Sequence, residues 1–119
     1  MKLKYASRYI EEQCTSVKAA TKLFGGNKKY VVGLFSRINA LENAVNMKDI
    51  ICSPQFRFHK LHGELDDYFA MDITNRRDKW RLIVCPLDES EQRFIPCNID
   101  EIVDKVEIIE IEEVSSHYE

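Results

Sequence analysis

The 119-residue sequence lacks an apolar run long enough to span a membrane, and it contains no internal repeat or low-complexity segment. The stretch 1–12 also lacks the uninterrupted apolar core of a secretory signal peptide, because charged residues recur through it. We therefore expect a cytoplasmic protein with no membrane partner. Its hydrophobic fraction of 45% and charged fraction of 31% are ordinary for a globular chain, and the length predicts a single domain over 1–119.

The cysteines lack the spacing of a redox motif or a metal cage. No Cys-x-x-Cys pair occurs among Cys14, Cys52, Cys85 and Cys97. Widely spaced cysteines without an export signal favour reduced, structural thiols over disulfides. Three histidines are compatible with zinc, but no Cys or His pair has an accompanying pair at finger-like spacing. We therefore expect neither a metal nor another cofactor.

Charge is divided unevenly along the chain. Residues 1–97 contain 16 Lys and Arg against 12 Asp and Glu, a balance of +4, whereas residues 98–119 contain 1 against 8, a balance of −7. A mildly basic body attracts polyanions. The acidic segment either neutralises that surface or stays solvated, and the solvated state is the usual one for such a tail.

Two amphipathic segments predict helices near 8–24 and 28–47, because apolar residues recur in each at helical spacing. Ser7 is expected to cap the first helix, and Gly25-Gly26-Asn27 to end it. The short joint between the segments predicts a helical hairpin.

Strand patterns occur near 2–6, 68–74, 80–87 and 106–114. Alternation in 68–74 predicts one buried face, whereas 80–87 is apolar on both faces apart from Arg81, as in a central strand. Two lysines in 2–6 suit an edge strand, and the long acidic excursion over 88–104 should contain a helical turn near 99–103. We therefore predict an α+β fold: a small, mostly antiparallel sheet with an N-terminal helical hairpin packed on one face.

Cations gather where the two central strands join. Arg76, Arg77 and Lys79 lie in the predicted hairpin loop, and Arg81 opens the next strand. The default interpretation of cations in such a loop is that they are solvated at its tip, and the alternative is that they bind phosphate. Arg81 is the stronger functional candidate, because a charge at the start of an apolar strand needs a reason. We expect any functional surface to lie near this hairpin.

The chain resembles the RelE/ParE superfamily of bacterial toxins, and in particular its HigB-like branch. The resemblance is carried by His59-Lys60-Leu61-His62-Gly63, by the strand 68–73, by Trp80-Arg81 and by 114–117, in that order. This chain has His62 where the family has lysine, and Ser115-Ser116 where it has Asp-Tyr. Topology extends the resemblance over nearly the whole chain.

The resemblance implies a toxin that cuts mRNA in the ribosomal A site without a metal, and that is held inactive by a cognate antitoxin, expected to be a helix-turn-helix DNA-binding protein. Two alternatives stay open. ParE-like members inhibit DNA gyrase without nuclease activity, and a toxin-like chain could act only within an antitoxin complex. The histidines favour the nuclease over the gyrase inhibitor, whereas the altered terminal motif favours the inactive form.

Metal-free RNA cleavage requires a base for the ribose 2′-OH and an acid for the leaving 5′-oxygen. Histidine suits both steps, because its unperturbed pKa lies near physiological pH. The candidate acid-base residues are His59, His62 and His117. Tyr118 is a second proton carrier or a stacking platform. His117 is the best candidate, because it alone of the histidines lies in the terminal motif.

Cleavage also requires positive charge against the developing phosphorane. Arginine suits this role because its planar fork stays charged. Arg81 is predicted to hold the scissile phosphate with Arg77 assisting, and Lys60 is a supporting cation. Arg76 and Lys79 are further candidates for phosphate binding, with Arg76 expected to matter less than Arg81.

Overall fold

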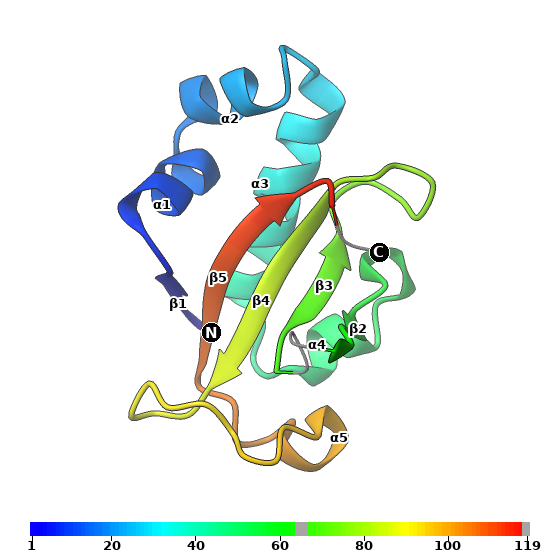
Figure 1. The fold of residues 1–119 in the computed structure, drawn as a ribbon. Helices are drawn as coiled ribbons and strands as arrows, with labels where there is room; N and C mark the ends of the chain where they lie inside the picture. Colours follow the sequence, from blue (N-terminus) through cyan, green and yellow to red (C-terminus); the bar gives the residue numbers. More distant parts are fainter. Residues whose placement is uncertain (64–66, 118–119) are drawn as a thin grey trace.

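A computed structural model of the protein describes residues 1–63 and 67–117 (Figure 1). Its strands form one mixed sheet in the order β1-β5-β4-β3-β2. The strands are β1 (Lys2–Tyr5), β2 (His59–Lys60), β3 (Phe69–Asp72), β4 (Arg81–Leu87) and β5 (Ile108–Ser115). Only β1 and β5 pair in parallel, and the remaining pairs are antiparallel. The α+β class and the mostly antiparallel sheet are therefore confirmed.

The predicted first helix is two helices, α1 (Arg8–Thr15) and α2 (Val17–Leu23). Ser7 caps α1 as predicted, with its Oγ accepting a hydrogen bond from the backbone N–H of Ile10. Ser16 then leaves the helical region at φ −112° and ψ 120°, and its Oγ accepts from the N–H of Ala19. A serine that caps a new helix breaks the old one, because its side chain competes for the same backbone donors.

Helix α3 (Lys28–Asn43) is shorter than predicted, because Ala44 adopts an extended conformation. Two short helical segments follow, α4 (Lys48–Ile51) and the 3₁₀ helix η1 (Pro54–Phe56). Helix α5 (Ile99–Ile102) lies at the turn predicted within 88–104. No helix in the described parts of the chain is both long and apolar enough to cross a bilayer.

Apolar side chains of α1, α2 and α3 pack in one core cluster with residues from a single face of the sheet. Figure 1 shows α3 crossing behind β5 and β4. The sheet residues of this cluster are Phe69, Met71, Leu82, Val84, Ile109, Ile111 and Val114. Gly33 lets α3 approach β3 closely, because a Cβ at that position would lie 2.5 Å from the carbonyl oxygen of Ile73.

Two sequence predictions about the sheet are wrong. Strand β3 is buried on both faces rather than one, because Ala70 packs with Leu61, Ile83 and Tyr68 on the face away from α3. The acidic C-terminal segment is not a solvated tail, since β5 lies inside the sheet between β1 and β4. Strand β4 is buried on both faces, and β1 lies at an edge, as predicted.

Candidate functional site

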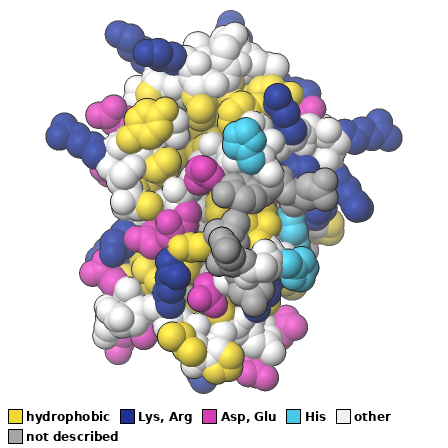
Figure 2. All heavy atoms as spheres, in the orientation of Figure 1, with side chains coloured by type: hydrophobic (Ala, Val, Ile, Leu, Met, Phe, Trp, Pro, Cys, Tyr) yellow, Lys and Arg dark blue, Asp and Glu magenta, His cyan; other side chains and the backbone are white. Residues whose placement is uncertain are grey.

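A pocket of about 510 Å³ lies at the end of the sheet where β3 stops, β4 starts and β5 stops. Register explains the convergence, because Arg81 pairs with Asp72 on one side and with Ser115 on the other. The pocket is lined by Arg57, Arg76, Arg77, Asp78, Lys79, Arg81, Ser116 and His117. The lining thus contains five cationic side chains and one carboxylate, that of Asp78. Figure 2, in the orientation of Figure 1, shows Lys and Arg side chains gathered around the β3–β4 loop.

The β3–β4 loop is held by short side chains. The Oδ1 of Asn75 accepts hydrogen bonds from the backbone N–H of Arg77 and of Asp78, an arrangement that mimics a backbone turn. Asp78 accepts from the hydroxyl of Thr74, and its Oδ2 lies 3.0 Å from the Nζ of Lys29 on α3. These two partners, Thr74 first, hold the pKa of the Asp78 carboxyl below its ordinary value. The loop carrying the cations is therefore tied to the helical layer.

Arg81 is buried in the pocket wall, with 5% of its surface exposed. Its Nη1 donates to the carbonyl oxygens of Asp78 and Trp80, and its Nη2 donates to that of Arg76 at 3.0 Å. Its Nε lies 3.2 Å from Oδ1 of Asp72. The charge at the start of this strand therefore has a structural role, because the guanidinium holds the β3–β4 loop through hydrogen bonds to its carbonyl oxygens. Direct phosphate contact by Arg81 stays a prediction.

Arg57 and Asp72 belong to the site, although the sequence patterns do not predict them. Arg57 Nε donates to Asp72 Oδ2, and Arg57 Nη2 donates to Asp72 Oδ1, both at 2.9 Å. Asp72 is 2% exposed, and its backbone oxygen accepts from the Nε of Arg37 on α3 at 2.8 Å. The one signal in the sequence was a carboxylate within an apolar strand. Its partner, 15 residues away, could not be read from spacing.

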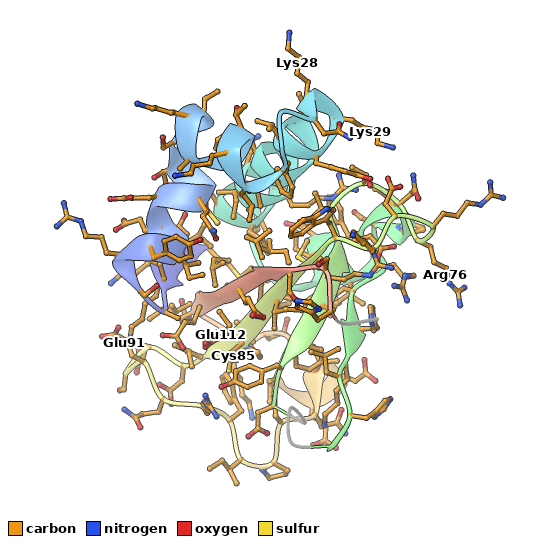
Figure 3. The ribbon with its side chains drawn as sticks, turned by 45° about the horizontal axis from the view of Figure 1, so that its top comes forward. Lys28, Lys29, Arg76, Cys85, Glu91 and Glu112 are labelled. Carbon is orange, nitrogen blue, oxygen red and sulfur yellow. The ribbon has the colours of Figure 1, made fainter. Side chains whose placement is uncertain are left out.

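The predicted loop cations and His117 do meet in this pocket. Arg76, Arg77, Lys79 and His117 are exposed and line it. Figure 3 shows Arg76 pointing outward from the loop. The backbone N–H of His117 donates to Oγ of the buried Ser115 at 3.0 Å, which positions the residue just past β5. Tyr118 lies outside the described residues.

The His59 segment faces a different hollow. His59 and Lys60 form β2, a strand that the sequence analysis did not predict, and they line a second pocket of about 520 Å³ between β2 and the segment 96–100. Lys60 Nζ donates to the carbonyl oxygen of Cys97 at 3.2 Å. His59 Nδ1 lies 2.6 Å from the carbonyl oxygen of Arg57, so that nitrogen carries a proton. His62 is exposed and is not among the described lining residues of either pocket.

Among the described cysteines, only Cys97 lines either of these two pockets, together with His59. No three His, Cys, Asp or Glu side chains within 1–63 and 67–117 gather as a metal ion requires. The four cysteines are free thiols. Burial raises the pKa of Cys14 and of Cys85 to about 12, so neither forms a thiolate readily at neutral pH.

The groups that converge in the 510 Å³ pocket are suited to holding an anion beside a titratable imidazole. Comparisons of the chain with family models, with curated proteins and with solved structures find no match. The function must therefore be inferred from the residues of the pocket and from the sequence motifs described above.

Proposed function

We propose that the chain is a RelE/ParE-type toxin of the HigB-like branch, and that the basic pocket binds the backbone of mRNA. The observation that carries the proposal is the convergence of cations from residue 57, from the loop 76–79 and from residue 81 with His117 in one pocket. Arginine-rich concave sites hold phosphates well, because planar forks match phosphate oxygens and stay charged. Within this proposal, the helices α1 to α3 on the sheet are the toxin's helical layer.

His117 is the proposed proton-transfer residue, and the reaction is metal-independent endoribonuclease cleavage on the ribosome. The exposed ring can approach a bound nucleotide, and the neighbouring arginines stabilise charge on the phosphorane. The site of action would be the cytoplasm, where the protein meets ribosomes. The proposed restraint is a cognate helix-turn-helix antitoxin that covers the basic face.

A second candidate is a toxin-like protein that binds RNA or antitoxin without cutting. The observation in its favour is that His59 and Lys60 line the other pocket, which leaves His117 as the one histidine among the described residues of the basic pocket. A single proton carrier can serve one of the two transfers that the reaction requires.

The test combines growth with direct cleavage. Expressing the protein alone should arrest bacterial growth, and a programmed ribosome should show cut mRNA. His117→Ala should lower the cleavage rate by about 10²- to 10⁴-fold, since general acid-base groups contribute that much. Thermal melting is the folding control, and the matched variant is His62→Ala, outside the pocket.

Unimpaired growth with abundant folded protein would remove the toxin proposal. RNA binding without cleavage, or with equal cleavage by His117→Ala, would favour the non-catalytic candidate. Slowed gyrase without RNA cleavage would move the chain to the ParE-like alternative.

A further inference from the structure

We propose that Asp72 is a positioning residue of the basic pocket, and that Arg57, which it orients, is the main contact for an RNA phosphate. The inference rests on the proposed RNA-binding function and assigns the phosphate contact within the same pocket. Neither residue belongs to the predicted set of site residues, and their pairing is visible only in the folded chain.

The carboxylate of Asp72 contacts two of the four arginines that line the pocket, Arg57 and Arg81. Its two oxygens each accept one hydrogen bond from Arg57 at 2.9 Å, and Oδ1 also lies 3.2 Å from Arg81 Nε. Two parallel bonds fix the plane of a guanidinium as well as its distance. Arg37 holds the backbone of Asp72 from α3, so both the helix and the sheet locate the carboxylate.

The two arginines bound to Asp72 differ in what they offer a ligand. The Arg81 side chain is 6% exposed, and its Nη atoms donate to loop carbonyl oxygens. The Arg57 side chain is 28% exposed and lines the pocket from the turn after η1, where its backbone is left-handed at φ 43°. Arg57 therefore combines an anchored guanidinium with access to the pocket, whereas Arg81 supports the loop.

Anchoring matters because an ordered side chain loses less entropy when it binds. A free surface arginine must give up rotamer freedom to meet a phosphate, and this cost is already met in a guanidinium held by a buried carboxylate. The loop residues Arg76 and Arg77 are exposed. We therefore expect them to attract RNA through their charge, without fixing the position of a phosphate.

A rival explanation is that the cluster only ties β3 to its neighbours, while RNA responds to total charge. The two explanations predict opposite changes in RNA affinity for Asp72→Asn. Asp72→Asn removes a negative charge beside the pocket, so a surface acting by charge alone should bind RNA more tightly. A clamp that depends on Asp72 should bind RNA more weakly, because Asn keeps one acceptor oxygen but puts an NH2 donor in place of the other, so only one of the two hydrogen bonds from Arg57 can remain.

The experiment measures binding of a labelled single-stranded RNA oligonucleotide to the full chain at several salt concentrations. The variants are Asp72→Asn and Arg57→Lys, and the matched control is Arg8→Lys on α1, whose side chain is 91% exposed. Arg57→Lys keeps the charge but loses the fork, and we expect about a tenfold loss of affinity, the equivalent of about 1.4 kcal/mol. Arg8→Lys should bind as the wild type does, and Asp72→Asn should bind more weakly.

Thermal melting separates positioning from loss of fold. If Asp72→Asn does not fold, Arg57→Lys decides, since its partly exposed side chain can still pair with Asp72. Wild-type affinity in Arg57→Lys, or tighter binding by folded Asp72→Asn, overturns the inference and leaves RNA binding in place. A wild type that binds no RNA overturns the proposed function and this inference with it.

Discussion

Asp72 on β3 and Glu112 on β5 are two carboxylates that the same sheet accommodates in opposite ways. Asp72 meets cations, with two bonds from Arg57 and an ion pair with Arg81. Glu112 meets another carboxylate, since it lies beside Glu110, and its Oε1 is buried without a hydrogen-bond partner.

The pKa of Glu112 is raised to about 7, first by burial and then by a hydrogen bond with Glu110 and the charge of Glu110, against the opposing charges of Arg93 and Lys4. Figure 3 shows Glu112 beside Cys85, whose thiol pKa burial also raises. A strand carboxylate removed from water is thus either paired with cations or made to hold a proton. Only the paired arrangement leaves cations organised around a pocket.

The largest expected effect is loss of the Asp72 carboxylate. Asp72→Ala would leave Arg81 buried without its charge partner, and breaking a buried pair from one side costs about 3–5 kcal/mol. Urea unfolding should show this loss, whereas Glu112→Ala should cost much less. If Asp72→Ala unfolds with a free energy within about 1 kcal/mol of the wild type, the arginines have found other partners and the contrast between the two sites fails.

A smaller loss is expected where α3 meets the Asp72 end of β3. In Gly33→Ala the new Cβ would lie 2.5 Å from the Ile73 carbonyl oxygen and 3.0 Å from Thr74 Cγ2, so the helix must move. Overpacking of this kind costs about 1–3 kcal/mol, and it should loosen the contact of Arg37 with Asp72. Thermal unfolding is the measurement, with Ser36→Ala on the exposed face as control. Equal melting temperatures for the wild type and Gly33→Ala would show that α3 can move away from the sheet without loss of stability.

The smallest expected effect is the pH dependence at Glu112. Its folded pKa of about 7 exceeds the ordinary 4.5, so between these values the folded chain holds a proton that the unfolded chain has lost. The contribution of this group to stability is therefore present at low pH and is lost as pH rises toward about 7 and above. The melting temperature of Glu112→Gln should therefore exceed that of the wild type by an increasing amount as pH rises through that interval.

Melting curves at several pH values test this, with Glu113→Gln on the same strand controlling for the loss of one charge. A constant difference between Glu112→Gln and the wild type at every pH would show that Glu112 has no raised pKa, and would end the comparison with Asp72.

Several features of the site could be predicted from the residues alone. The loop cations were expected at an exposed hairpin tip, and they are there, because a short polar link between two strand patterns has few other conformations. Arg81 was singled out because a charge at the start of an apolar strand needs a reason, and its partners supply a structural reason. The partners themselves, three loop carbonyl oxygens and Asp72, depend on how the loop folds back.

Other features could not be predicted, because they depend on what covers each strand. Alternation in 68–74 placed Asp72 on the more polar face, and nothing local shows that Leu61 and Tyr68 cover Ala70 on that face. His59 and Lys60 were candidates for the same site as Arg81 and His117, yet their pairing with β3 places them in the pocket beside the segment 96–100 instead. Strand β2 has two residues, too few for a periodic pattern.

Periodicity and turn chemistry along the chain determined the α+β class, the central position of β4, the cap at Ser7 and the basic loop, because each depends on neighbours within a few residues. The tertiary structure alone decided that Arg57, Asp72, Arg81 and His117 belong to one end of the sheet. It did so through strand register and burial, which join residues far apart in sequence and set which charges are paired, which are exposed and which must take up a proton.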